Sequence, residues 1–370
     1  MIPMRVLSLR TLNRTLLERQ FLLERTPLPV IDVVRHLVAM QAQEPNWPYV
    51  GLWTRVKGFA HGELTGLFQD RGVVRGTMVR RTQHLAAAED FGWLRPSVQP
   101  VVRAAVNQSY FAPHLEGLDL DELASAGREL IRSGELTRSE LGRLLEERFP
   151  GRPGARLALV VESLESVVYP PPNGVWGAWG NRTSTPLALA DEWTGVPMAA
   201  RADLRTLVLR YLASFGPAGV MDVQAWSGLT RLREVVESLP LRTFRTVDGK
   251  VLYDLPDAPI ADSGAPAPVR FLPAFDNAAL GHKDRTRLIS DADRRRIAPV
   301  AALGVPLFLV DGFVRGSWSF KDGALRITPF RPLSGAEEEA VRAEARPLFG
   351  FVAGPEAEAG QGAPEDIAFA

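Results

Sequence analysis

Two glutamines separated by one residue, Gln41 and Gln43, have the chemistry and the spacing to hold one water molecule. They follow a stretch of helical periodicity at about residues 31–39, and Pro45 and Pro48 then interrupt regular helix. On an extended segment, side chains two positions apart point to the same side, so the two amides would converge. Each amide offers two donors and one acceptor carbonyl. We therefore take the pair as candidate catalytic residues; a solvated turn at the end of a helix is the alternative.

Residues close to the pair suggest further contacts. Trp47, Tyr49 and Trp53 could stack on a base or a sugar, and core packing is the alternative for all three. Glu44 is an alternative general base, although on an extended segment it points away from the side that Gln43 faces. We take Trp47 and Tyr49 as the candidate contacts to such a base or sugar.

Composition excludes several classes of protein. The 370 residues suggest two or three domains, and the 46% hydrophobic content is ample for packed cores. The absence of cysteine excludes disulfides, thiolate metal sites and a cysteine nucleophile. The five histidines have no metal-ligand spacing, so we expect no metal and no cofactor. With no signal peptide and no apolar run long enough for a membrane span, we expect a soluble, cytoplasmic protein.

The charge is balanced, with 43 basic and 43 acidic residues and a net charge of +0. Balance does not exclude nucleic acid, because arginines can gather on one face of a neutral chain. Most of the basic residues are arginine, whose planar fork suits phosphate contacts.

The order of predicted elements indicates winged helix-turn-helix units. A helix capped by Ser8 and running to about Leu23 is followed by the Gln-pair helix and by short helices at about residues 48–56 and 60–69. Residues 73–86 then read as strand, turn and strand. This hairpin carries four candidate DNA-binding residues: Arg75, Arg80, Arg81 and His84. The alternatives are a solvated hairpin for the arginines and a hydrogen-bonded structural role for the histidine.

The pattern recurs twice. Residues 101–200 show a helix, a second helix with a capping box at Thr137 and Glu140, a third helix and a wing turn. Residues 201–256 repeat this order and end in a hairpin at Asp248-Gly249. Together with a first unit at residues 1–100, these predict an α+β chain of three tandem winged-helix units.

The last third of the chain changes character. After a proline-rich linker, residues 269–350 read as a small β-barrel or curved sheet closed by a helix, and 354–370 as a disordered tail. A polar segment within this region supplies five more candidate DNA-binding residues: Asn277, His282, Lys283, Arg285 and Arg287.

Over almost its full length the chain resembles a bacterial family of tandem winged-helix DNA glycosylases. The blocks that carry the resemblance are Gln41-Ala42-Gln43, residues 75–78, 82–85 and 89–90, Phe275-Asp276-Asn277, and residues 310–312 with 314–318. The family's catalytic signature is Gln, an apolar residue and Gln, and a sister branch has Asp or Asn at the last position. The resemblance implies that Gln41 and Gln43 are catalytic and that the three units form a C-shape around a basic concave surface.

The resemblance also implies a substrate, namely double-stranded DNA carrying N7-alkylguanine or an interstrand cross-link of the azinomycin B type. We expect a monomeric, monofunctional glycosylase of base excision repair or self-resistance. Alkylation at N7 makes guanine a cationic leaving group, so the protein has to place water against an oxocarbenium-like sugar. A base tied to the opposite strand cannot be flipped, which favours an open basic groove. A transcriptional regulator or other non-catalytic DNA binder, and a protein-interaction scaffold, are the alternatives.

Overall fold

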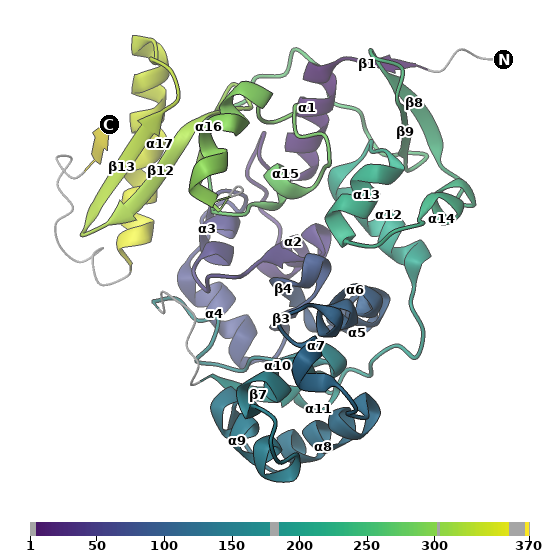
Figure 1. Cartoon of the computed structure of the whole chain (residues 1–370). Coiled ribbons are helices and arrows are strands. Elements are labelled where there is room, and N and C mark those ends of the chain that lie inside the picture. The colour runs from purple at the N-terminus through teal and green to yellow at the C-terminus, as the bar shows by residue number, and fades with distance from the viewer. Residues whose placement is uncertain (1–4, 178–184, 302–303, 355–366, 370) are drawn as a thin grey trace.

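The structure, a computed structural model, describes residues 5–177, 185–301, 304–354 and 367–369. Figure 1 shows unit 1 in the middle of the molecule, unit 2 below it, unit 3 to its right and a C-terminal sheet at the upper left. We use unit 1 for residues 30–87, unit 2 for residues 120–189 and unit 3 for residues 204–254. Each unit has the element order of a winged helix, which is a helix, a short strand, two helices and a hairpin.

Unit 1 contains the glutamine pair. Its elements are α2 (Val30–Leu37), β2 (Met40–Gln41), α3 (Trp47–Trp53), α4 (His61–Gln69), β3 (Val73–Thr77) and β4 (Gln83–Ala87), with a 3-10 turn η1 (Val79–Arg81) between the last two. Strand β2 pairs antiparallel with β4, and β4 pairs antiparallel with β3. The helix predicted to reach residue 39 ends at Leu37, because Val38 adopts a positive φ of 66°.

Unit 2 repeats this order. Its elements are α8 (Leu120–Ser133), β5 (Leu136–Thr137), α9 (Arg138–Arg148), α10 (Gly154–Leu164), β6 (Val167–Val168) and β7 (Pro186–Leu189). Thr137 and Glu140 form the predicted capping box at the start of α9. Because β6 also pairs with β3, units 1 and 2 share one six-stranded sheet in the order β2-β4-β3-β6-β7-β5.

Unit 3 has the same order with a reduced first strand. Its elements are α12 (Leu204–Phe215), α13 (Val220–Ser227), α14 (Arg233–Glu237), β8 (Arg242–Thr246) and β9 (Val251–Asp254). A single bridge between Ala218 and Tyr253 replaces the first strand. Helix α14 is short, with five residues.

The N-terminal segment lies against unit 3 and not within unit 1, which corrects the predicted boundary at residues 1–100. Strand β1 (Val6–Leu7) pairs parallel with β8. Helix α1 (Leu9–Arg19) follows, capped by Ser8 as predicted but ending before Leu23. Its Arg19 forms a buried, two-pronged ion pair with Asp254 of β9 at 2.7 and 2.8 Å. Two segments far apart in the sequence are thereby fixed together.

Several short helices connect the units and were not predicted. They are α5 (Ala88–Ser97), α6 (Gln99–Arg103), η2 (Ala104–Asn107), α7 (Ala112–Leu115), α11 (Ala190–Thr194), α15 (Asn277–Leu280) and α16 (Asp291–Ala301).

The C-terminal region is the predicted curved sheet with a helix. Its elements are β10 (Arg270–Leu272), β11 (Leu307–Val310), β12 (Phe313–Lys321), β13 (Ala324–Pro329), α17 (Gly335–Ala353) and β14 (Ile367–Phe369), and the strands follow one another in sequence order. Strand β14 pairs parallel with β13, so the prediction of a disordered tail is wrong for residues 367–369. The rest of that predicted tail, residues 355–366 and 370, lies outside the described residues.

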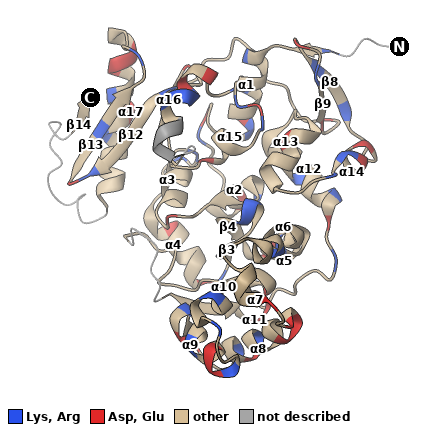
Figure 2. Cartoon of the chain, in the orientation of Figure 1, with Lys and Arg blue, Asp and Glu red and all other residues tan. Residues whose placement is uncertain are grey.

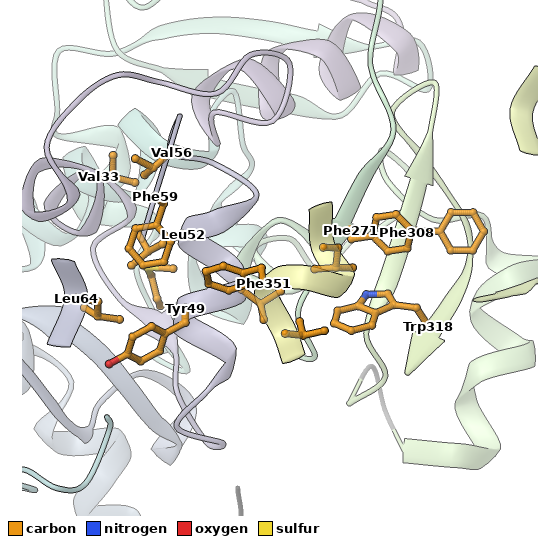
Figure 3. Packing of buried hydrophobic residues seen from close by; sticks show 14 of the residues in the cluster. Val33, Tyr49, Leu52, Val56, Phe59, Leu64, Phe271, Phe308, Trp318 and Phe351 are labelled. Carbon is orange, nitrogen blue, oxygen red and sulfur yellow. The ribbon is translucent and has the colours of Figure 1, made fainter. Parts of the chain in front are cut away.

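One hydrophobic cluster joins unit 1 to this sheet. Figure 3 shows Tyr49 and Phe59 of unit 1 on one side of Phe351 from α17, with Phe271 and Trp318 of the sheet on the other. A second cluster joins β3, β4 and α5 to the helices of unit 3. Unit 1 is thus held from two sides by packed apolar side chains.

Candidate active site

The glutamine pair lies where unit 1 changes from strand to loop. Gln41 is opposite His84 in the β2–β4 pair, and the Ala42 N–H donates to Gln83 O at 2.9 Å. Ala42, between the two glutamines, is fully buried. Helix α3 does not begin until Trp47, so residues 42–46 form a non-helical loop. The backbone is therefore extended through the first residues of the motif.

Arg75 holds this loop from behind. Its Nε donates to Ala42 O at 2.7 Å and its Nη2 donates to Gln43 O at 3.0 Å. Its Nη1 donates to the side-chain oxygen of Asn173, in the wing of unit 2. Arg75 is 1% exposed, and burial lowers its pKa to about 10, so it remains cationic at neutral pH. In this structure Arg75 fixes the loop that carries Gln43 and has no surface for the predicted phosphate contact.

The Gln41 amide is locked in one orientation. Its Oε1 accepts from Thr82 Oγ1 at 3.2 Å and from Arg80 Nη2 at 3.4 Å. Both groups face the oxygen as donors, so the amide nitrogen is the end of the side chain that remains for other contacts. Gln41 is only 7% exposed.

Gln43 is more open than Gln41. Its Oε1 makes one long contact, 3.5 Å from the Gln83 N–H, and its side chain lines a cavity of about 420 Å³. Unit 2 forms much of the opposite wall of this cavity through Arg138, Leu159, Glu162, Ser163 and Tyr169. No local pattern indicates these wall residues, because the contact between the two units is long-range. Gln43 therefore faces a space that a substrate or a water molecule can enter.

Arg80 and His84 support Gln41 from the side. Arg80 Nη1 donates to Trp226 O of unit 3 at 2.7 Å, while Nη2 lies 3.4 Å from both the Gln41 oxygen and His84 Nε2. His84 Nδ1 lies 2.9 Å from Thr82 O, and a carbonyl only accepts, so Nδ1 carries the proton. Burial, reinforced by Arg80, lowers the His84 pKa to about 3. This neutral, fully buried histidine has no surface for DNA, which corrects that prediction.

The aromatic residues beside the pair divide into two groups. Tyr49 is fully buried, with its hydroxyl 3.0 Å from Thr65 Oγ1, and Figure 3 shows it inside the cluster. It belongs to the core, so the predicted sugar contact does not fit this structure. Trp47 is half-buried, meets Trp318 edge-on at 5.9 Å between ring centroids and lines a small cavity together with Gln41.

In the segment after β10, three of the predicted DNA-binding side chains are buried and contact backbone carbonyls. Asn277 Nδ2 donates to Ala39 O at 2.5 Å, His282 Nε2 lies 3.0 Å from Phe215 O, and Arg287 Nη1 donates to Pro217 O at 3.1 Å. All three are buried, with 5% exposure or less, so the phosphate contacts predicted for them do not fit this structure. Lys283 is exposed and Arg285 half-buried.

Four of the predicted DNA-binding residues keep some exposed surface. They are Arg80, Arg81, Lys283 and Arg285. Burial, together with the nearby charge of Arg285, lowers the pKa of Arg80 to about 10. Burial, together with the nearby charge of Arg294, lowers the pKa of Arg285. Arg80 and Arg81 also line the cavity that Gln43 faces. Elsewhere basic and acidic residues alternate, as on α8, α9 and α14 in Figure 2.

The described residues contain neither a candidate metal site nor a helix that could span a membrane. No group of three or more histidines, aspartates and glutamates in the described part of the chain could hold a metal ion. No helix among those residues is both long and apolar enough to cross a membrane.

Comparisons with known proteins assign the chain to a family. The family model described as DNA glycosylase AlkZ-like matches residues 34–351. A curated Streptomyces sahachiroi protein named interstrand DNA cross-link repair glycosylase is 25% identical over 360 residues, which cover 89% of this chain and 92% of that protein. The solved structure of Streptomyces sahachiroi DNA glycosylase AlkZ is 21% identical and shares the fold, with a TM-score of 0.79 over 99% of this chain and 100% of that one. The matched span includes both glutamines and every residue that holds them, and the chain belongs to the AlkZ-like DNA glycosylase family.

Proposed function

We propose that this glycosylase hydrolyses the N-glycosidic bond of cationic N7-alkylguanine in DNA, interstrand cross-links included, and that Gln43 holds the attacking water. One observation carries the proposal. Arg75 holds the backbone carbonyl of Gln43, and Gln43 lines a cavity. Its side chain therefore extends from a fixed backbone into open space.

The chemistry suits a site built from amides. An N7-alkylated guanine leaves as a neutral base and needs no proton, so no strong general acid is required. The remaining task is to place water against the oxocarbenium-like sugar, and positioning of this kind contributes on the order of 7–11 kcal/mol at best. Neutral amides are weak bases, so uncharged lesions such as uracil should not be substrates. The nearest lysine in sequence, Lys57, lies beyond α3, which argues for a monofunctional enzyme.

The two glutamines have different roles in this proposal. The Gln41 oxygen already accepts from Thr82 and Arg80, so Gln41 acts as a donor through its amide nitrogen. Gln43 Oε1 has only one long contact and accepts a hydrogen from the water. Glu44 remains the alternative base. Its carboxylate lies close enough to Arg75 to oppose in part the lowering of the Arg75 pKa by burial.

The exposed cations define the proposed DNA path. Arg81, Lys283 and Arg285 contact phosphates, with Arg80 at the inner end beside Gln41. The cavity at Gln43 is bounded by two units and is not enclosed within one, so it can be reached without extrusion of a base that is tied to the opposite strand.

The test is base release from three duplexes that differ only in the lesion. We expect the native chain to leave an abasic site at an N7-alkylguanine, to separate the strands of an N7-linked cross-link, and to leave a uracil duplex intact. Release no faster than without protein would overturn the catalytic proposal. Cleavage of the monoadduct without strand separation would limit the substrate to monoadducts.

A further inference from the structure

The small cavity behind Gln41 has the features of a binding site for one water molecule. Gln41, Arg55, Asp276 and Asn277 are its polar lining, and the space open to the centre of a water molecule is about 10 Å³. That is close to the minimum that one buried water requires, and such a water also needs two to four polar partners.

Two of these lining residues each have a buried polar atom with no hydrogen-bond partner among the described residues. These atoms are Arg55 Nε, a donor, and Asn277 Oδ1, an acceptor. Both residues are otherwise fully engaged. Arg55 pairs with Asp276 through two contacts of 2.8 and 2.9 Å, and Asn277 Nδ2 donates to Ala39 O. An unpartnered buried polar group is costly, so a donor and an acceptor beside one cavity point to a shared ligand.

We propose that a buried water bridges Arg55 Nε and Asn277 Oδ1 and accepts a third hydrogen bond from the Gln41 amide nitrogen. The Gln41 oxygen is held by Thr82 and Arg80, which leaves the nitrogen for the cavity that the side chain lines. The water accepts from Arg55 and Gln41 and donates to Asn277. Asn277 is thus a positioning residue for the catalytic amide, and this inference rests on the proposed function of Gln41.

Asn277 connects to the motif in two ways under this proposal. Through Nδ2 it fixes the backbone at Ala39, two residues before Gln41, and through Oδ1 and the water it fixes the Gln41 side chain. The resemblance between this chain and the glycosylase family includes Asn277, and its burial gives that residue a role other than DNA contact.

The activity test compares Asn277→Leu with Asn277→Ala in single-turnover base release at saturating enzyme. Leucine fills the space and displaces the water, whereas alanine leaves room for a second water to replace the lost amide. We expect Asn277→Leu to lose about 10-fold in rate, Asn277→Ala to lose less, and neither to weaken DNA binding. A role in packing alone predicts the reverse order, because alanine leaves the larger void. Equal rates, or a slower alanine variant, would overturn the proposal.

A control and a direct observation complete the test. Asn13 is another fully buried asparagine, with its amide nitrogen bonded to Arg287 O and Gly312 O. Asn13→Leu should lower the melting temperature and leave the rate of the folded enzyme unchanged. A high-resolution crystal structure of the native chain should show a water within hydrogen-bond distance of Arg55 Nε and Asn277 Oδ1. Its absence there would refute the site even if base release is confirmed, and its presence without base release would refute only the catalytic assignment.

Discussion

Units 1 and 2 share one topology and one continuous sheet, and they differ where the first strand meets the second helix. In unit 2, β5 ends at Thr137, which is itself the cap of α9. In unit 1, β2 ends at Gln41 and α3 begins at Trp47, so five residues, 42–46, separate the two elements. Unit 3 has only Gly219 between its bridge at Ala218 and α13. The loop that carries Gln43 therefore lies at a junction that is tight in the other two units.

Units 1 and 2 also differ in the partners of one arginine in each unit. Arg138 at the start of α9 in unit 2 is paired with Glu162, whereas Arg75 in unit 1 makes no ion pair among the described residues and bonds two carbonyls and an amide oxygen. Unit 2 thus uses its arginine within its own fold, and unit 1 uses one to hold a loop.

The largest expected effect follows from removing the side chain that faces the cavity. Gln43→Ala should lower the single-turnover rate of base release on the order of 10²-fold, with little change in DNA binding. The matched change at the unit 2 junction, Thr137→Ala, should cost about 1 kcal/mol of stability through the lost cap and leave the rate unchanged. A rate loss in Thr137→Ala as large as that in Gln43→Ala would remove the distinction between the two junctions.

A smaller loss of rate should follow from removing the Arg75 side chain, which holds the Ala42 and Gln43 carbonyls. Arg75→Met keeps the volume but frees the Ala42 and Gln43 carbonyls, so we expect about a 10-fold slower rate and lower stability. Arg95 is a matched control, since it is also 1% exposed, has a pKa lowered to about 10 by burial and bonds Glu165 O. Arg95→Met should lower the melting temperature comparably while the folded enzyme keeps its rate. Equal rate losses in both variants would mean that Arg75 acts only through the stability of the fold.

The dependence on pH should separate stability from chemistry. Burial lowers the pKa of both His84 and His282 to about 3, below the ordinary value of 6.5. Protonation then favours the unfolded chain, so their contribution to stability is complete above pH 6.5 and declines as the pH falls toward 3. At pH 5 the loss is about 2 kcal/mol for each histidine. Denaturant unfolding at pH 7 and pH 5 measures it, with His84→Asn losing less on acidification than the native chain.

Over the range where the chain stays folded, the rate should not change with pH. Neither amide titrates, and His84 stays neutral above pH 4. A rate that rises through an apparent pKa between 5 and 8 would point instead to a titrating base, with Glu44 the first to be replaced.

The smallest effects concern the DNA path. Arg81→Ala and Arg285→Ala should each weaken DNA binding a few-fold and reduce the slope of log affinity against log salt by about one. Arg143, exposed on α9 and paired with Glu147 four residues along, is the control, and its replacement should leave the slope unchanged. An unchanged slope in the Arg285 variant would move the DNA path elsewhere.

Much of the fold follows from local patterns, and much of the site does not. The capping box at Thr137 and the hairpin at Asp248-Gly249 are short-range signals, and both formed where predicted. Strand β14 and the placement of β1 against β8 depend on pairing across the chain, which no local pattern encodes.

The same division holds for the candidate site residues. The spacing of Gln41 and Gln43 indicated a site, but the types of Arg75, His84 and Arg287 suggested DNA contact when burial makes them internal supports. A sequence shows that an arginine is present and not whether a carbonyl or a phosphate will face it. The cavity wall from unit 2 was equally hidden, because Glu162 and Gln43 are brought together only by the shared sheet.

The most direct test of the central claim is a double-mutant cycle at the two glutamines. Single-turnover base release from an N7-alkylguanine duplex is measured for the native chain, Gln41→Ala, Gln43→Ala and the double variant, with exposed Gln69→Ala as the control. If both amides act on one water, the double variant should be about as slow as Gln43→Ala alone, while all variants still bind DNA. Losses that add in full would mean that the two residues act independently. Rates equal to that of the native chain would contradict a catalytic role for the pair.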